Sequence, residues 1–594
     1  MQLTSALCRA SALATLALLS SSCSAQAAVA PSQMGQTATA PAPATQGVIP
    51  PSTPSSEPPV QITADLSKTT GPYKPIYSWF GYDEANYTTM RNGKQLLRDL
   101  HDLSPVPVYI RVHHLLTSGT GKAELKFSST NVYREDASGK PIYDFTILDD
   151  IFDEYKAAGV RPMVEFGFMP KDLATTLPDR KDYQVHYPKS AISGASNNPP
   201  KDYAKWGELI RAVTQHLVER YGHDTVQQWY FEVWNEPDID YWHATPQDYW
   251  KLYDYAVAGV RAALPTARVG GPASTSPSNP HAYEFLRGFL DHVKSGKSLA
   301  NGKAIPMDFI SFHAKGQPRI LEGHVTMGLA HELSDVDHGF SLIASYPEFK
   351  SLPIILSEAD PEGCAACSSR VNPANNYRNG TLYPAYTATA FKALFDIQDK
   401  HNVNLISMLS WSFEFEDKDY FEGFRSLATN GIDKPILNLF RMLGLMSGNR
   451  VQTSSTSAIP LDTLINTGVR ANTDVDAFAT AGERQAAVLL WNYHDADEPA
   501  PASSVSLSIS GLPDNVHRVL VQHYRIDDTH SNAYTVWKQM GSPQQPTTEQ
   551  YAQLQASAGL QLLTAPLWAE VANGKLQLNS SMPRQSISLV KLTW

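Results

Sequence analysis

Short apolar runs, rich in β-branched and aromatic residues, recur through the middle of the chain, and each ends in polar residues. A longer segment with helical periodicity follows each run. This alternation is typical of a parallel sheet whose faces are covered by helices. Eight runs are predicted to be strands: 77–81, 108–113, 161–166, 229–236, 268–271, 308–313, 354–358 and 405–411.

The segment between the third and fourth predicted strands shows a clear helical pattern. Its apolar residues recur at steps of three and four, the stripe expected where a helix packs on a sheet: Trp206, Leu209, Ile210, Val213 and Leu217. Eight strand–helix units predict an α/β fold, a (β/α)8 TIM barrel with long loops. The alternative is a doubly wound open sheet, but no G-x-G-x-x-G loop follows the first strand to favour a dinucleotide-binding version.

Beyond residue 448 the pattern changes to short alternating strands such as 505–509 and 587–589, and the turn at 481–483 predicts a hairpin. We therefore expect a C-terminal antiparallel β-sandwich, with one helix within 548–563. Acids, bases and nucleophiles are not concentrated in this region, so a packing or substrate-framing role is predicted for it.

The N-terminal residues have the layout of a secretory signal peptide. Arg9 precedes the apolar run 11–19, and small-residue cleavage sites follow at 25–27 and 28–30. The run is too short to span a bilayer. Cys23 is a candidate for lipid attachment, although serines precede it where a bacterial lipobox usually has leucine. These features predict an exported protein, periplasmic or extracellular, that a lipid on Cys23 would tether to the membrane.

Residues 31–60 are poor in large apolar side chains and rich in Pro, Ser, Thr, Ala and Gln, so they are predicted to form a linker. The predicted organisation is a signal peptide at 1–30, this linker, the catalytic barrel at 61–447 and an accessory β-sandwich domain at 448–594.

Composition limits the classes of function. The 594 residues include 48 basic and 59 acidic side chains, a formal charge of −11, and 42% are hydrophobic. These values exclude a coiled coil, a disordered regulator and a disulfide-stapled miniprotein. An acidic surplus without a basic arm argues against nucleic acid as a partner and favours neutral or cationic ones. The 27 Tyr and 11 Trp residues can stack on sugar rings, although most should lie in the core.

Two of the predicted strands end in glutamate, Glu236 and Glu358, after strongly apolar runs. The chemistry of a barrel lies where its strands end, because the loops there converge on one mouth. Partial burial beside Trp and Tyr raises the pKa of a carboxyl group towards that of a general acid. Two carboxyl groups about 5 Å apart are what retaining glycoside hydrolysis requires. An isolated strand-end glutamate is more often a salt-bridge partner or a solvated acid.

The string Trp-Asn-Glu-Pro at 234–237, with a second glutamate ending the seventh strand, resembles the retaining glycoside hydrolases of clan A, specifically glycoside hydrolase family 39. Bacterial members of that family include β-xylosidases. The resemblance implies that Glu236 is the acid/base residue, that Glu358 is the nucleophile and that Asn235 binds the sugar 2-hydroxyl. It runs from about residue 79 to 446, with supporting motifs at 80–87, 109–113, 309–316 and 411–417.

The same resemblance implies roles for further strand-end residues. His113 should contact sugar hydroxyls far from the reacting bond, although His114 stands where the family often has glycine. His313 should hydrogen-bond the nucleophile or the sugar, and Trp411 should form the floor on which the sugar stacks. The alternatives are packing or surface histidines and a buried core tryptophan.

The segment after the eighth strand holds three acids, Glu414, Glu416 and Asp417. One of them should bind sugar hydroxyls by resemblance, and we favour Glu416, although the loop here differs in length from that of the family. Asp360, two residues beyond Glu358, is interpreted as a loop acid.

Cys364 and Cys367 form a C-x-x-C motif shortly after the proposed nucleophile. A redox role needs a thioredoxin-like context that is missing, and a zinc site needs two more ligands that are not nearby. A short structural disulfide is therefore predicted beside Glu358.

The predicted function is a retaining glycoside hydrolase, an exo-acting β-xylosidase that releases xylose from xylooligosaccharides during xylan degradation. The double displacement calls for no metal and no organic cofactor. The alternatives are another clan A glycosidase (an arabinosidase, galactosidase or exopolysaccharide hydrolase) or a non-catalytic carbohydrate-binding protein that kept the barrel.

Overall fold

The computed structural model describes residues 58–183, 194–361 and 367–594. The predicted signal peptide, nearly all of the predicted linker, Cys23 and Cys364 lie outside these residues. Among the helices that the structure describes, none is long and apolar enough to cross a membrane.

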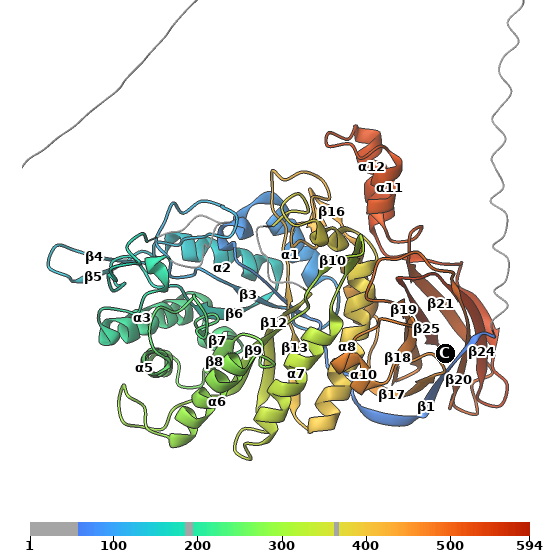
Figure 1. The fold of residues 1–594 in the computed structure, drawn as a ribbon, viewed down its shortest axis with the longest axis horizontal. Helices are drawn as coiled ribbons and strands as arrows, with labels where there is room; N and C mark the ends of the chain where they lie inside the picture. The colour runs from blue at the N-terminus through green and yellow to red at the C-terminus, as the bar shows by residue number, and fades with distance from the viewer. Residues whose placement is uncertain (1–57, 184–193, 362–366) are drawn as a thin grey trace, which may run out of the picture. The chain divides into compact units, whose positions relative to one another are not determined.

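The barrel is built from a parallel sheet with eight strand positions (Figure 1). The eighth position is shared by β13 and β14, which only Leu409 separates; β13 pairs with β12, and β14 pairs with β2, so the sheet closes on itself. This closure confirms the predicted TIM barrel and all eight predicted strands. In spatial order around the barrel the strands are β2 (Trp79–Tyr82), β3 (Tyr109–Val112), β6 (Arg161–Phe166), β7 (Tyr230–Val233), β8 (Arg268–Ser274), β9 (Phe309–Lys315), β12 (Pro353–Asp360), β13 (Asn404–Met408) and β14 (Ser410–Trp411).

Helices follow the barrel strands and cover the outside of the sheet (Figure 1). The predicted apolar stripe lies on α3 and is fully buried. Close contact between α3 and α5 depends on glycine, because a Cβ on Gly259 would lie 2.4 Å from the carbonyl oxygen of Gly207. The main helices are α1 (Arg91–His101), α2 (Thr146–Ala158), α3 (Tyr203–Tyr221), α5 (Pro246–Ala263), α6 (Pro280–Ser295), α7 (Leu329–Ala344), α8 (Leu382–His401) and α9 (Pro435–Gly444).

Smaller elements lie in the connections. Among the described residues, three two-stranded hairpins pair β4 with β5, β10 with β11 and β15 with β16. The bounds are β4 (Tyr133–Glu135), β5 (Pro141–Tyr143), β10 (Arg319–Leu321), β11 (His324–Thr326), β15 (Ala428–Thr429), β16 (Ile432–Asp433), α4 (His223–Val226), α10 (Leu461–Asn466) and the 3-10 helices Ala85–Thr89, Ala195–Asn197 and Pro373–Asn379.

The C-terminal sheet has ten strands, antiparallel except for one parallel pair, and agrees with the predicted sandwich. The predicted hairpin joins β18 to β19, and the predicted helix is α12; α11 was not predicted. The elements are β17 (Asn449–Ser455), β18 (Asp474–Gly482), β19 (Gln485–Tyr493), β20 (Ser503–Ser510), β21 (Arg518–Ile526), α11 (Ala533–Gln539), α12 (Thr548–Ala558), β22 (Gln561–Leu562), β23 (Leu567–Glu570), β24 (Leu576–Met582) and β25 (Ser586–Thr593).

One face of β18 and β19 packs on α8 of the barrel. The ring centroids of Phe391 on α8 and Phe478 on β18 lie 5.4 Å apart, and Lys392 forms an ion pair with Asp476 at 3.4 Å. Apolar side chains of both regions belong to one continuous core. The barrel and the C-terminal sheet are therefore joined by a hydrophobic interface.

The predicted start of the barrel at residue 61 needs correction, because β1 (Val60–Pro72) belongs to the C-terminal sheet. Its Ile62 faces Ser455 of β17 on one side and Leu507 of β20 on the other. The side chains of β1 alternate between the core and solvent, as the pleat of a half-buried strand requires. Without β1, both neighbouring strands would present unpaired backbone groups at a sheet edge.

We predict that Ile62→Ala lowers the free energy of unfolding by about 2–4 kcal/mol, because Ile62 is completely buried and the truncation leaves a cavity. The neighbouring Thr63 faces solvent, so Thr63→Ala should cost less than about 1 kcal/mol. Differential scanning calorimetry of both variants checks the difference. Equal losses would contradict the position of β1 inside the sheet.

Candidate active site

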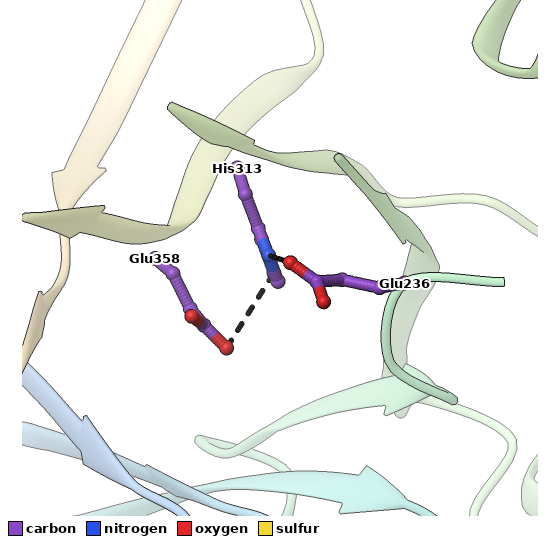
Figure 2. Close-up of side chains that lie close together, drawn as sticks. All are labelled: Glu236, His313 and Glu358. Carbon is purple, nitrogen blue, oxygen red and sulfur yellow. Dashed lines mark hydrogen bonds and ion pairs between the residues drawn. The ribbon is translucent and has the colours of Figure 1, made fainter. Parts of the chain in front are cut away.

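The two strand-end glutamates lie close together at the mouth of the barrel (Figure 2). Glu358 is on β12, and Glu236 follows β7 by three residues. One carboxylate oxygen of each and a ring nitrogen of His313 all lie within 4.8 Å of one another. This spacing is the one that a retaining double displacement uses, whereas inversion needs a gap of roughly 6.5–9.5 Å.

The backbone at Glu236 has an unusual conformation. Trp234 and Glu236 both have positive φ, 72° and 46°, a region that side chains with a Cβ rarely adopt. Hydrogen bonds hold the segment in place: the Trp234 amide donates to Phe166 and the Glu236 amide donates to Ala273. Strain of about 1–3 kcal/mol at each such position persists only where the surroundings enforce it. The local fold is therefore built to present the Glu236 carboxyl at the mouth.

Cations surround the carboxylate of Glu358. Lys315 Nζ lies 2.7 Å from Oε2, and Arg111 Nη1 lies 3.1 Å from Oε1. Burial alone would raise the pKa of Glu358, but Lys315, His313, the hydrogen bond from His113 and Arg111 together hold it well below its ordinary value. Glu358 is thus an ionised, desolvated carboxylate, as a nucleophile must be.

His313 lies between the two glutamates (Figure 2). Its Nδ1 is 2.8 Å from Oε1 of Glu236, a hydrogen bond, whereas its Nε2 is 3.9 Å from Oε1 of Glu358, which is too long for one. The resemblance had implied a bond to the nucleophile or the sugar, and the structure places the bond on Glu236 instead. Because imidazole can donate or accept at Nδ1, this bond can persist in either protonation state of Glu236.

Arg111, completely buried on β3, connects four strand ends. Its guanidinium contacts Glu165 at 2.8 Å, Glu232 at 2.5 Å and Glu358 at 3.1 Å. It also donates to Oδ1 of Asn235 at 2.9 Å. Since arginine is only a donor, Oδ1 must face it, and the amide Nδ2 of Asn235 then points the other way. This orientation suits the implied role of Asn235, donation to a sugar 2-hydroxyl.

His113 lies beneath the site, within the same charged cluster. Its Nδ1 is 2.7 Å from Asp83, and its Nε2 is 3.2 Å from Glu165 and 3.4 Å from Glu358. Burial would lower the pKa of His113, but Glu165 and Asp83 raise it to about 9. Both ring nitrogens thus face carboxylates, and the contact with sugar hydroxyls remains a prediction. The adjacent His114 does not crowd it, because a left-handed backbone turns that ring towards Phe168.

Trp411 is only 1% exposed and presents almost no ring surface to a sugar. Its ring packs at 4.4 Å from that of His113 and lies under the guanidinium of Arg111. A Cβ on Gly81 of the neighbouring strand would lie 2.3 Å from this ring, so glycine is needed there. The structure therefore favours the alternative, a buried core tryptophan that supports Arg111 and His113.

The structure does not bring Glu416 to the paired glutamates. Its carboxylate accepts a hydrogen bond of 2.6 Å from the amide of Asn92, in the first turn of α1. Glu414 is buried and accepts from the amide of Gly431, and burial raises the pKa of Glu414 to about 8. Glu416 is thus corrected to a residue that accepts a hydrogen bond from the first turn of α1, whereas Arg425 of the same connection reaches Asp83 in the pocket.

Several residues of the site were missed by the sequence analysis: Arg111, Lys315, Glu165 and Asp83. The sequence does contain a signal for Arg111 and Lys315. Arg111 lies two residues before His113, and Lys315 lies two residues after His313, so each shares a strand face with a predicted residue. Asp360 shows the same pattern and is corrected from a loop acid to a residue of β12 whose carboxylate lies 2.7 Å from Lys315.

Glu236, His313 and Glu358 could together offer three ligand atoms to a metal ion. Lys315 and Arg111 already neutralise Glu358, and a divalent cation beside them would meet strong repulsion. The donor set therefore suits proton transfer and nucleophilic attack better than metal binding. Cys367 is buried and forms a disulfide, and its pairing with Cys364, which lies outside the described residues, stays a prediction.

Comparisons with known proteins agree with this chemistry. The family model described as Glycosyl hydrolases family 39 matches residues 93–566. The chain is 28% identical over 505 residues to a β-xylosidase of Geobacillus stearothermophilus, covering 82% of this chain and 86% of that protein. It is 25% identical over 578 residues to an α-L-iduronidase of Mus musculus, covering 90% of this chain and 81% of that protein. A solved structure of a monomeric β-xylosidase from Caulobacter crescentus CB15 matches with a TM-score of 0.70 at 23% identity, over 90% of this chain and 99% of that chain, which supports the fold.

The raised pKa of His113 predicts a pH dependence of stability. Its pKa is about 9 in the folded chain against 6.5 for a free histidine, so its protonation stabilises the fold fully below about pH 6.5. This stabilisation is lost as the pH rises through 9. The difference in unfolding free energy between the unchanged chain and His113→Gln should shrink over that range in denaturant titrations.

The matched control is His114→Gln. Burial lowers the pKa of His114 to about 3, so this ring is neutral in the folded chain over that range. From about one pH unit above the free value of 6.5, its substitution should therefore have a constant effect. A constant effect of His113→Gln over the same range would contradict the assignment of a charged His113.

Proposed function

The chain belongs to glycosyl hydrolase family 39, and we propose that it is a retaining, exo-acting β-xylosidase that releases xylose from xylooligosaccharides. The observation that carries the proposal is the pair Glu236 and Glu358, with oxygens within 4.8 Å, one carboxylate held ionised and the other hydrogen-bonded to His313. As a member of this family the chain is a glycoside hydrolase, so a purely carbohydrate-binding role is set aside.

In the first step, an oxygen of Glu358 attacks the anomeric carbon while protonated Glu236 gives its proton to the leaving glycosidic oxygen. A glycosyl ester of Glu358 forms and the aglycone departs as an alcohol. Lys315 and Arg111 keep the attacking carboxylate ionised before the step. Donation from Asn235 to the 2-hydroxyl strengthens as the ring flattens, which favours the transition state over the bound substrate.

In the second step, Glu236, now a carboxylate, takes a proton from water as the water oxygen attacks the anomeric carbon, and Glu358 leaves. The hydrogen bond between His313 and Glu236 suits this change of role. When Glu236 is ionised, Nδ1–H of His313 donates to it; when Glu236 is protonated, the carboxyl group can donate to Nδ1. His313 would thus orient the carboxyl group through both steps.

Charge in the pocket favours a neutral sugar over an acidic one. Lys315 is paired with both Glu358 and Asp360 at 2.7 Å. Lys126 lies 3.2 Å and Arg425 3.0 Å from Asp83. Each of these cations already contacts a carboxylate, and Asp83 is shared by Lys126, Arg425 and His113, so the carboxylate of a uronic acid would have to compete with these ion pairs. This argues for the β-xylosidase among the relatives rather than the α-L-iduronidase.

A panel of aryl glycosides tests the substrate. We expect the purified chain to cleave 4-nitrophenyl β-D-xyloside with the highest kcat/KM, above the α-L-arabinoside, β-D-galactoside and α-L-iduronide. NMR of the first product should show the β-anomer, because two inversions retain the configuration. If another glycoside is cleaved with a higher kcat/KM, the assigned substrate changes from xylose to that sugar and the mechanism is unaffected. If the first product is the α-anomer, the retaining mechanism is wrong.

On the same xyloside, Glu358→Ala should abolish turnover, and azide should restore it as an α-xylosyl azide. Glu236→Ala should lower kcat/KM by about 10²–10⁴-fold for a poor leaving group and far less for dinitrophenyl xyloside, since a good leaving group needs little acid catalysis. Azide added to this variant should give the β-xylosyl azide. Identical azide products from the two variants would contradict the assigned roles.

We also propose that the chain is exported, on the basis of the apolar run 11–19 and the small-residue sites that follow it. The periplasm or the medium would then hold the mature enzyme, tethered if Cys23 carries a lipid. Mass spectrometry of the mature chain distinguishes cleavage at 25–30 from lipid attachment at Cys23, and an intact N-terminal methionine would refute export by this signal.

A further inference from the structure

A hollow of about 650 Å³ lies outside the paired-glutamate site, on the rim of the barrel. Its walls come from three places: the first turns of α1, the connection between β14 and α9, and the region of α12. The connection starts at the end of the eighth strand position, and its Glu416 binds the first turn of α1. The hollow, which we name the rim cleft, therefore lies on the barrel face where the strands end.

Three cations line the rim cleft: Arg91, Arg98 and Lys418. Arg91, Gln95 and Arg98 are spaced by four and three residues, so they lie on one exposed face of α1. Arg98 donates to Gln95 at 3.1 Å. Asp99 is turned to the amide of Gln95. Within residues 58–183, 194–361 and 367–594, no ion pair joins any of the three cations to a carboxylate, and none of the lining residues is acidic.

This arrangement differs from the catalytic pocket, where each cation has a carboxylate partner. It is also unusual in a chain whose formal charge is −11. Cations gathered around a hollow repel one another unless an anion binds between them. The rim cleft is thus electrostatically complementary to a negatively charged ligand.

The remaining lining groups suit a sugar. Tyr420 and Tyr551 offer aromatic rings for stacking, and the side chain of Gln555 offers an amide for hydroxyl groups. The walls are fixed to one another, because Gln544 bonds the backbone of Tyr420 at 2.7 Å and Tyr551 donates to the carbonyl of Asn430 at 3.1 Å. A ligand would therefore meet a preformed surface.

We propose that the rim cleft is a second glycan-binding site that takes a carboxylate-bearing oligosaccharide. Arg91, Arg98 and Lys418 bind the carboxylate, and the two tyrosines pack against sugar rings. The inference goes beyond the proposed reaction and requires only that the natural substrate is a glycan. It gives a glycosidase with a neutral-sugar pocket a means to hold substrates whose side branches or backbone carry acids.

The test measures binding to the full chain carrying Glu358→Ala, so that no probe is cleaved. The probes are xylotriose bearing one glucuronic acid and the same molecule after reduction of its carboxyl group. Calorimetric titration should show that adding Arg91→Gln and Arg98→Gln weakens binding of the acidic probe about tenfold, since two exposed ion pairs with the carboxylate are lost. Binding of the reduced probe should not change. At about 1 M salt the advantage of the acidic probe should vanish.

The matched control removes two exposed arginines elsewhere, Arg211→Gln and Arg287→Gln, which are paired with acids on α3 and α6. These changes should leave both probes unaffected. Tyr420→Ala removes a ring without a charge and should weaken both probes alike. Equal binding of the acidic and reduced probes to the unchanged cleft, or equal losses in the control pair, would overturn the proposal.

A second pair of probes, tetragalacturonate and its carboxyl-reduced form, separates this inference from the proposed substrate. If xylosides are not substrates, the rim cleft should still prefer the acidic member of this pair. If xylosides are cleaved but neither acidic probe binds more tightly than its reduced form, the second site is refuted and the reaction stands.

Discussion

The buried guanidinium of Arg111 is the interaction on which the site depends. A buried charge at the centre of a barrel is tolerated only if it is hydrogen-bonded and paired with opposite charge. Arg111 is paired with glutamates on β6, β7 and β12 and donates a hydrogen bond to Asn235. Burial raises the pKa of Glu165 to about 8, so the cluster need not carry every negative charge at once. The same contacts that satisfy the arginine hold Asn235 and Glu358 in place.

The charge at each site depends on local contacts between side chains and does not follow the net charge of the chain. The acidic surplus argued against a nucleic-acid partner, and that stays a prediction. It could not show that the cations of the catalytic pocket all contact carboxylates while, among the described residues, no ion pair joins the cations of the rim cleft to an acid. Both arrangements depend on which side chains meet across loops and strands. A formal charge of −11 is compatible with a pocket of paired charges and a cleft lined by cations in one molecule.

The barrel could be predicted because its strands are continuous apolar runs, which local sequence reveals, and the two glutamates could be found because each ends such a run. Arg111 and Lys315, the partners of Glu358, were missed because their role depends on contacts with residues of neighbouring strands, which the local sequence does not show. Glu416 was misplaced for a related reason, since its partner, the amide of Asn92, lies far away in the sequence. Trp411 was expected to face the sugar, but its ring fills the space left by Gly81.

The position of β1 has a consequence for the order in which the molecule can assemble. Gln61 on this strand bonds a residue 395 positions further along the chain, and its other neighbour, β20, is made later still. During synthesis from the N-terminus, the barrel can close before the strands that pair with β1 have been made. The first and last strands that the structure describes, β1 and β25, thus belong to one sheet, so a chain interrupted before β20 leaves one edge of β1 unpaired and open to association with other chains.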